Sequence, residues 1–234
     1  MPGPITHLKA AYIFGEISEI KDKPQLYLGA IVPDSVNVYG HAPMHKRWPA
    51  HLRDANLNIW LSNAKAFYNE NKGKINEEYL LGYILHIVTD IVWDKYFDDK
   101  LYALISEPVG EDKKTARWNE IYGFEQKQLN LPWADEMLKS LKEARPLAIS
   151  TLTEDIIAIM KQSVLDNDIS KGTEPQVLND DFMNPFFIKV VEVMQNLIKM
   201  LEIALDLNPR LETLDSHILP HFSTPKQLKP LPLG

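Results

Sequence analysis

The stretch Gly82-Tyr83-Ile84-Leu85-His86-Ile87-Val88-Thr89-Asp90-Ile91-Val92-Trp93-Asp94 places an imidazole and a carboxylate inside an otherwise apolar run. His86 and Asp90 are four residues apart, so on an α-helix they lie on the same face. A buried ionised carboxylate costs several kcal/mol unless a positive group lies beside it, and no Lys or Arg follows on this face until Lys95. We therefore expect a bound metal ion to supply the charge. The alternative is a His86–Asp90 hydrogen bond that stabilises a core helix.

Helical periodicity recurs along the rest of the chain, whereas strand patterns are scarce, so the sequence predicts an all-α protein. Asn76 is the expected N-cap of the helix that carries His86. Because Pro33 disfavours helical geometry in the residue before it, we expect Asp34 to open a long connection to about His51. The predicted helices cover residues 5–20, 26–32, 52–69, 77–98 and 113–129, with two more after the start signals Thr151-x-x-Glu154 and Asn184-Pro185.

The helix predicted after Asn184-Pro185 carries apolar side chains at helical spacing, which is typical of a stripe that faces a core. This stripe comprises Phe187, Val190, Val191, Met194, Leu197, Ile198, Leu201 and Leu205. With 234 residues, 45% of them hydrophobic, the chain is long enough to build one sizeable core. We expect a single helical domain over residues 1–224 and a C-terminal tail over residues 225–234, which holds three prolines and two lysines.

The overall composition excludes several classes of function. The chain has 32 acidic against 25 basic residues, so it offers no broad basic surface, and we do not expect duplex nucleic acid as its main partner. It has no cysteine, which excludes disulfides, thiolate zinc sites and a cysteine nucleophile. No basic region followed by an apolar segment opens the chain, and no apolar run approaches the ~18 residues of a membrane span. These features predict a cytoplasmic protein without a transmembrane segment.

The histidines are unevenly distributed along the chain. Five of the seven fall within the first 86 residues, and none lies between Ile87 and Ser216. Together with Asp34 and Asp90 they form a His and Asp set spread over several elements, which is how helical bundles build metal sites from facing helices. Nitrogen and oxygen ligands of this kind suit zinc, and also manganese or iron.

Four segments of the first 100 residues resemble the zinc-dependent phospholipase C family and occur in the order found there. They are Pro4-Ile5-Thr6-His7, Leu28-Gly29-Ala30-Ile31-Val32-Pro33-Asp34-Ser35, Lys46-Arg47-Trp48-Pro49-Ala50-His51-Leu52 and Gly82-Tyr83-x-x-His86-x-x-x-Asp90. The resemblance implies a helical bundle of the phospholipase C and nuclease type.

The resemblance also implies a metal centre and an activity. Its ligands would be His7, Asp34, His51, His86 and Asp90, with Asp90 able to bridge two ions. Asp34 would also be the catalytic residue, a general base toward a water molecule at the metal. The implied activity is metal-dependent hydrolysis of a phosphodiester or phosphomonoester, with a small phosphorylated molecule or a lipid headgroup as substrate.

Two departures from the family pattern affect the number of ions. The chain begins with Met1-Pro2 where secreted members begin with a metal-binding tryptophan, and after Asp90 no histidine appears until His217. We therefore expect one or two ions, most readily Zn²⁺. Possible replacement ligands are Glu120, Glu125, His217 and His221. Glu120 and Glu125 point about 140° apart on a helix, so at most one should face a given site.

Several neighbouring residues have competing interpretations. His41 and His45 lie in the same segment as His51 and compete with it for one ligand position. Trp93, Trp118, Tyr122 and Trp133 are expected to be core aromatics rather than a substrate cage. The sequence does not identify substrate-binding residues. Two alternatives to the hydrolase remain open, namely a nuclease or nucleotidase on the same scaffold and a non-catalytic metal-binding helical protein.

Overall fold

A computed structural model describes residues 2–18, 20–105, 112–168, 170–201 and 203. Within these residues the chain forms ten α-helices and one 3₁₀ helix, and its β-structure is a single isolated bridge between Ile149 and Leu152. The predicted all-α class is confirmed. The elements are α1 (Pro4–Ile17), α2 (Lys23–Gly29), η1 (Val32–Asn37), α3 (Met44–Ala50), α4 (Leu57–Asn71), α5 (Glu77–Tyr96), α6 (Asp98–Leu104), α7 (Lys113–Leu129), α8 (Pro132–Glu143), α9 (Glu154–Leu165) and α10 (Asp180–Met200).

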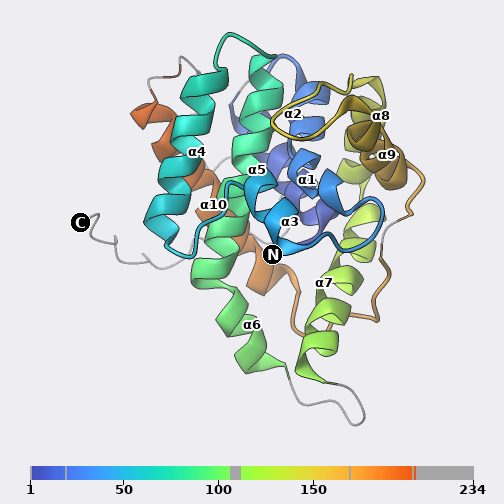
Figure 1. The fold of residues 1–234 in the computed structure, drawn as a ribbon. Coiled ribbons are helices and arrows are strands. Elements are labelled where there is room, and N and C mark those ends of the chain that lie inside the picture. Colours follow the sequence, from blue (N-terminus) through green and yellow to red (C-terminus); the bar gives the residue numbers. More distant parts are fainter. Residues whose placement is uncertain (1, 19, 106–111, 169, 202, 204–234) are drawn as a thin grey trace.

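Helix α5 is the central element of the fold, with α1, α2, α4 and α10 packed around it (Figure 1). Every residue from Tyr79 to Trp93 is buried, so the helix is enclosed on all sides over this length. Its start follows the prediction, because the Asn76 side chain accepts a hydrogen bond from the Tyr79 N–H. Polar side chains on this segment must therefore find their partners inside the protein.

Helices α2 and α5 cross in backbone contact at two glycines. A Cβ atom on Gly29 would lie 2.1 Å from the carbonyl oxygen of Tyr79, and one on Gly82 would lie 2.2 Å from that of Leu26. No larger residue fits at either position without moving a helix. The crossing brings the C-terminal end of α2 close to the middle of α5, where His86 is located.

The predicted long connection from Asp34 to His51 is wrong, because it contains two helical elements. Residues 32–37 form η1, with Pro33 in its first turn, where the missing N–H of proline costs no hydrogen bond. Residues 44–50 form α3, which ends directly before His51. Asp34 and His51 are thus held by short ordered elements rather than by a loose loop.

Other helix boundaries also differ from the prediction, while α7 begins and ends at the predicted residues. Helix α4 starts at Leu57 because Asn56, and not a residue near 52, caps it by accepting from two N–H groups. The predicted helix over 77–98 ends at Tyr96, and α6 begins at Asp98. Helix α8 was not predicted at all.

The two start signals predicted for the last helices are both wrong. Thr153 rather than Thr151 is the N-cap residue of α9. Helix α10 begins at Asp180, capped by the Asn179 side chain, so Asn184-Pro185 lies inside the helix instead of opening it. The apolar stripe of α10 is nevertheless buried from Phe187 through Ile198, and Leu201 is partly buried.

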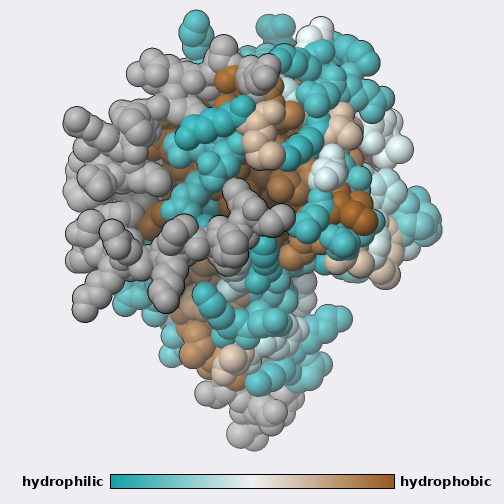
Figure 2. Space-filling view, turned by 90° about the vertical axis from the view of Figure 1, so that its left-hand side faces the viewer, coloured by the Kyte–Doolittle hydropathy of each residue, from teal (hydrophilic) through white to brown (hydrophobic). Residues whose placement is uncertain are grey.

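The buried apolar residues form one core cluster that extends from α1 to α10. Hydrophilic and hydrophobic side chains are intermixed on the part of the surface that Figure 2 colours. Ile59 of α4 and Met200 of α10 are among the exposed apolar residues. None of the described helices is long and apolar enough to span a bilayer. Leu205, His217, His221 and the predicted tail at 225–234 lie outside the described residues.

Candidate metal centre

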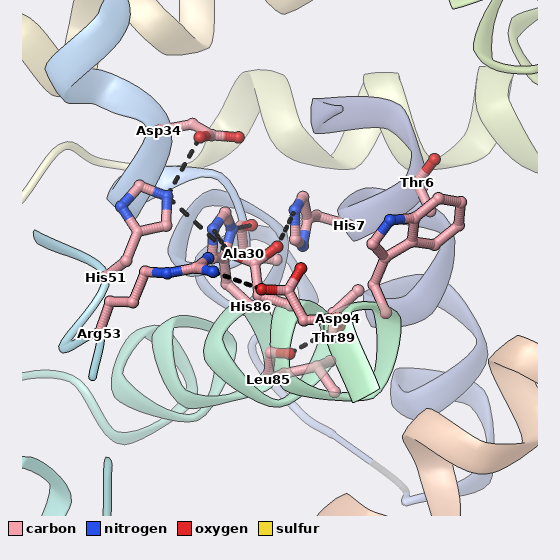
Figure 3. A network of polar contacts seen from close by, with 12 residues as sticks. Thr6, His7, Ala30, Asp34, His51, Arg53, Leu85, His86, Thr89 and Asp94 are labelled. Atoms are coloured by element: carbon pink, nitrogen blue, oxygen red, sulfur yellow. Dashed lines mark hydrogen bonds and ion pairs between the residues drawn. The ribbon is translucent and has the colours of Figure 1, made fainter. Parts of the chain in front are cut away.

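The fold brings together all five residues predicted as metal ligands, from four separate elements. Figure 3 labels four of them, His7, Asp34, His51 and His86. His7 comes from the first turns of α1, Asp34 from η1 and His51 from the end of α3, while His86 and Asp90 occupy neighbouring turns of α5. Four of these side chains are at most 1% exposed, whereas that of Asp34 is 14% exposed. The cluster is thus buried, and Asp34 is its most accessible member.

The distances between the ligand atoms are longer than ordinary hydrogen bonds. Nε2 of His7 lies 3.5 Å from Oδ1 of Asp90, and Nε2 of His86 lies 3.6 Å from its Oδ2. Nε2 of His51 lies 3.3 Å from Oδ1 of Asp34 and 4.0 Å from Oδ2 of Asp90. Two atoms that each bind a tetrahedral ion at about 2.0–2.1 Å are themselves about 3.3 Å apart, so these separations suit atoms that share an ion.

Two of the histidines are oriented by backbone carbonyl groups. Nδ1–H of His86 donates to the carbonyl oxygen of Ala30 at 2.8 Å, next to the glycine crossing of α2 and α5. Nδ1–H of His51 donates to the carbonyl oxygen of Arg47 at 2.9 Å. Because a carbonyl can only accept, both rings carry their proton on Nδ1 when neutral, which leaves Nε2 with a lone pair directed into the cluster.

The backbone at His51 is itself fixed by two core aromatic residues. Nε1–H of Trp60 donates to the carbonyl oxygen of His51 at 2.7 Å, and the Tyr83 hydroxyl donates to that of Ala50. Trp60 and Tyr83 are fully buried. These contacts tie the end of α3 to α4 and α5, and so hold the His51 ring against the cluster.

Several atoms of the cluster are buried without a hydrogen-bond partner. They are both ring nitrogens of His7, Nε2 of His86 and both carboxylate oxygens of Asp90. Buried polar atoms of folded proteins are almost always paired, and each unpaired one costs about 1–3 kcal/mol. Orphaned nitrogen and oxygen atoms that converge on one another are the donor set that a divalent cation requires, so the residues fit a metal ion.

Burial also shifts the protonation of the cluster. Desolvation, together with the neighbouring His86, lowers the pKa of His7 well below its usual value, and desolvation lowers the pKa of His86 to about 4. The two rings stack in parallel at 3.7 Å, an arrangement that two charged imidazoliums would oppose. Neutral imidazole is the form that binds metals.

The two aspartates respond to burial in opposite ways. Burial raises the pKa of Asp90 to about 7, so without a cation beside it this carboxyl tends to keep its proton. For Asp34 burial acts in the same sense, but the contact with His51, together with the neighbouring rings of His86 and His7, outweighs it and lowers the pKa below its usual range. The same contact with Asp34 raises the pKa of His51 against the effect of its burial.

The donor atoms form two overlapping groups that could each hold an ion. His7, Asp34 and His86 make one group, and His51, His86 and Asp90 make the other, with each group's atoms within 4.8 Å of one another. His86 belongs to both. The arrangement is compatible with one ion or with two close together, and its nitrogen and oxygen donors suit zinc, manganese or iron.

The competing histidines lie outside both groups. His41 is exposed and its Nε2 lies 2.7 Å from a guanidinium nitrogen of Arg47, and His45 is exposed on α3. Glu120 is also elsewhere, because its carboxylate accepts hydrogen bonds from the backbone N–H groups of residues 176–178. Glu120 therefore fixes the segment before α10 and is not one of the donors of the cluster.

Glu125 is buried beside the start of α1 and belongs to neither donor group. Its Oε1 accepts from both the N–H and the hydroxyl of Thr6, at 2.9 and 2.7 Å. Gly3, the N-cap residue of α1, has no side chain to do so, so a carboxylate from α7 caps this helix one residue before His7. No local sequence signal could reveal the contact, because 119 residues separate the partners.

The four predicted core aromatics divide into two pairs. Trp93 and Trp133 are buried in the core as expected. Trp118 and Tyr122 are only partly buried and stack on each other at 5.4 Å between ring centroids. Trp118 lines a cleft of about 460 Å³ that reaches His51 and that the sequence did not predict.

The cluster is the candidate functional site of the described residues. Its members are the five buried or nearly buried donors contributed by α1, η1, α3 and α5. Comparison with protein-family models, with curated proteins and with solved structures finds no match to this chain.

Proposed function

We propose that the protein is a metal-dependent phosphoester hydrolase, similar to zinc-dependent phospholipase C, that holds one or two zinc, manganese or iron ions. The observation that carries the proposal is the set of unpartnered atoms on His7, His86 and Asp90, which converge in the core at separations that suit shared coordination. The four sequence segments that resemble the phospholipase C family contribute all five donors. A divalent cation at this place would neutralise charge on phosphoryl oxygens and lower the pKa of water.

Asp34 has the properties of a general base in such a site. It is the most exposed member of the cluster, at 14%, so water can reach it. The His51 ring fixes the orientation of its carboxylate through the 3.3 Å contact between Nε2 of His51 and Oδ1 of Asp34. In the proposed reaction Asp34 takes a proton from water as the water oxygen bonds to phosphorus and the ester oxygen leaves.

A non-catalytic metal-binding protein is the second candidate, and the burial of the cluster favours it. Side chains that are at most 1% exposed leave little room for a substrate at four of the five donors. The two candidates differ in whether a coordination position stays open to solvent. Turnover of any phosphoester by the metal-loaded protein separates them.

The first test is the metal content of protein purified without chelator. We expect at least about one divalent ion per chain by elemental analysis. His86→Ala and Asp90→Ala should each remove most of it, because His86 belongs to both donor groups and Asp90 supplies the carboxylate of the second group. His45→Ala, which changes an exposed histidine outside the cluster, is the matched control. Equal metal content in all of these proteins would refute the metal centre.

The second test is turnover of bis(p-nitrophenyl) phosphate and p-nitrophenyl phosphate with zinc, manganese or iron supplied. Asp34→Asn should lower kcat by about 10²-fold or more, the scale of a lost general base, since the amide cannot take a proton. Metal content should fall less than turnover, because the amide oxygen still offers a ligand atom. If the wild-type protein binds metal but hydrolyses neither ester, the non-catalytic candidate replaces the hydrolase.

A further inference from the structure

A cleft of about 460 Å³ lies directly beside the metal centre, and the two share His51. Its walls come from α3 and the residues after it, from the C-terminal end of α5, from the start of α6 and from Trp118 of α7. This volume is within the range of small-molecule sites, about 300–1,000 Å³. A phosphoester bound at the cluster would therefore have its remaining part in this cleft.

The carboxylates of the cleft are already engaged with cations. Asp94 pairs with Arg53 (Figure 3), and the Arg53 guanidinium also lies over the Trp60 ring at 4.6 Å from its centroid. Asp98 accepts from Nε of Arg117 and from the Trp93 indole, each at 2.7 Å. Their negative charge is thus compensated within the protein, so it does not repel an anion from the cleft.

Arg47 is the cation of the cleft whose charge is not matched in this way. Within the described residues it forms no ion pair, and its guanidinium contacts the imidazole of His41 at 2.7 Å. Its Nε is buried without a hydrogen-bond partner. Its own carbonyl oxygen orients the His51 ring, so its backbone lies next to the cluster, and Arg47 also lines the cleft. A guanidinium binds anionic oxygens through its fork of N–H groups.

Two indole rings supply the apolar part of the cleft. Trp48 and Trp118 both line it and are both partly exposed. Trp118 is held in place by its stacking on Tyr122, with interplanar angle 19°, and by the Arg117 guanidinium 4.9 Å from its ring centroid. Fixed aromatic faces of this kind bind other planar rings by stacking.

We propose that the cleft binds a nucleoside monophosphate, with the base against Trp118 and Trp48 and an anionic oxygen on Arg47. The proposal rests on the proposed function, since it assigns the substrate class of the same site. Arg47, beside His51, would bind the phosphate of the ligand, and the two indole rings would stack on its base. The acidic balance of the chain, 32 Asp and Glu against 25 Lys and Arg, favours a single nucleotide over a long polymer.

The test is a fluorescence titration of the full-length, metal-loaded protein with AMP, adenosine, glycerol 3-phosphate and inorganic phosphate. Trp60, Trp93 and Trp133 are buried in the core, so quenching by a ligand in the cleft reports on the two cleft tryptophans. We expect AMP to quench saturably and to bind about tenfold or more tightly than glycerol 3-phosphate, which lacks a base to stack. Equal affinities for these two ligands would overturn the proposal.

Variants then assign the two ends of the ligand. Trp118→Leu should weaken AMP binding about tenfold, while Trp118→Phe keeps a stacking face and most of the affinity. Arg47→Met should weaken the binding of AMP but not that of adenosine. Arg145→Met changes an exposed arginine away from the cleft and should leave both affinities unchanged. Unchanged AMP affinity in both Trp118→Leu and Arg47→Met, each verified as folded by circular dichroism, would refute the site.

The outcomes separate this proposal from the hydrolase. Hydrolysis of bis(p-nitrophenyl) phosphate together with equal binding of AMP and glycerol 3-phosphate would reject the nucleotide cleft and keep the hydrolase. Tight, Trp118-dependent AMP binding by a protein that hydrolyses no phosphoester would reject the hydrolase and keep a nucleotide-binding cleft.

Discussion

Helices α5 and α10 pack against each other and are almost equally long, with 20 and 21 residues, yet they are built on different principles. Helix α10 is amphipathic, and its buried residues recur every three or four positions from Met183 to Ile198. Helix α5 is buried on every side from Tyr79 to Trp93 and still contains a histidine, a threonine and an aspartate. One helix presents a single face to the core, and the other runs through it.

The difference shows on which helix a polar residue indicates a binding site. On an amphipathic helix such as α10 a polar residue faces water and needs no explanation. On an enclosed helix each polar atom is satisfied inside or is costly. Thr89 donates to the carbonyl oxygen of Leu85 and is satisfied within its own helix, whereas Nε2 of His86 and both oxygens of Asp90 are not. Only the unsatisfied pair calls for a ligand.

The largest effect on the free energy of unfolding is expected for a substitution in α10, which contributes to stability through apolar packing. Phe186 is fully buried against Trp93, Phe97 and Phe187. Phe186→Ala should lower the free energy of unfolding by about 3–5 kcal/mol, the cost of a lost ring and the cavity it leaves. Metal content per folded molecule should stay unchanged. Urea denaturation and elemental analysis measure the two quantities.

Met200→Ala is the control on the same helix. Its side chain is exposed, so the change should stay within about 0.5 kcal/mol. If Phe186→Ala removed the metal from the folded protein, α10 would be part of the metal centre, and the contrast between the two helices would fail.

The next effect concerns Glu125, a buried carboxyl that faces α1. Burial raises its pKa from 4.5 to about 7, so the folded protein holds a proton that the unfolded chain releases. The stability that this group contributes is complete below pH 4.5 and is lost as the pH rises to 7. Glu125→Gln cannot lose a proton, so its stability relative to wild type should rise by about 3 kcal/mol over this interval.

Chelator-treated samples of both proteins, unfolded by urea at a series of pH values, provide the measurement. All other titrating groups are common to the two chains, so the difference isolates Glu125. A difference that stays constant with pH would show that this carboxyl is already ionised in the folded protein.

The smallest effect is expected for Thr89→Val, which removes a polar group from α5 while keeping its shape. Because the hydroxyl bonds only to the preceding turn of its own helix, we expect a change of at most about 1 kcal/mol in the free energy of unfolding. Metal content and turnover should match wild type. If this substitution removed the metal, a buried polar residue of α5 would contribute to the metal centre even when its hydrogen bond is satisfied. The contrast between Thr89 and the pair His86 and Asp90 would then fail.

The fold could be predicted where a signal is local to one helix. Asn76 caps α5 as expected, because its side chain reaches the N–H of Tyr79 three residues ahead. Asn184-Pro185 offers the same kind of start signal but lies inside α10, because Asn179 caps the helix earlier and the core packing of the helix extends across the proline. A cap motif gives a possible boundary, and tertiary packing decides which boundary is used.

The candidate site could be predicted partly from local spacing and partly from the resemblance to a known family. His86 and Asp90 are four residues apart on one helix, so their spacing alone places them together. The resemblance in the first 100 residues supplied His7, Asp34 and His51. Glu125 with Thr6 was beyond reach, because its contact is created only when α7 packs against α1. The same holds for the cleft between Arg47 and Trp118.

The glycine crossing of α2 and α5 sets a rule for recognising other chains with this site. Gly82 lets the helices touch, and four residues later His86 bonds to the carbonyl oxygen of Ala30, which directly follows Gly29. The close approach of the helices at Gly82 and the orientation of the His86 ring are therefore structurally coupled. A distant chain that keeps a histidine and an aspartate at this spacing, but has a bulky residue four positions before the histidine, would have to separate these two helices. The histidine would then lose the hydrogen bond to the backbone carbonyl that orients its ring. The sequence pattern expected for this site is therefore Gly-x-x-x-His-x-x-x-Asp together with an upstream Gly-Ala.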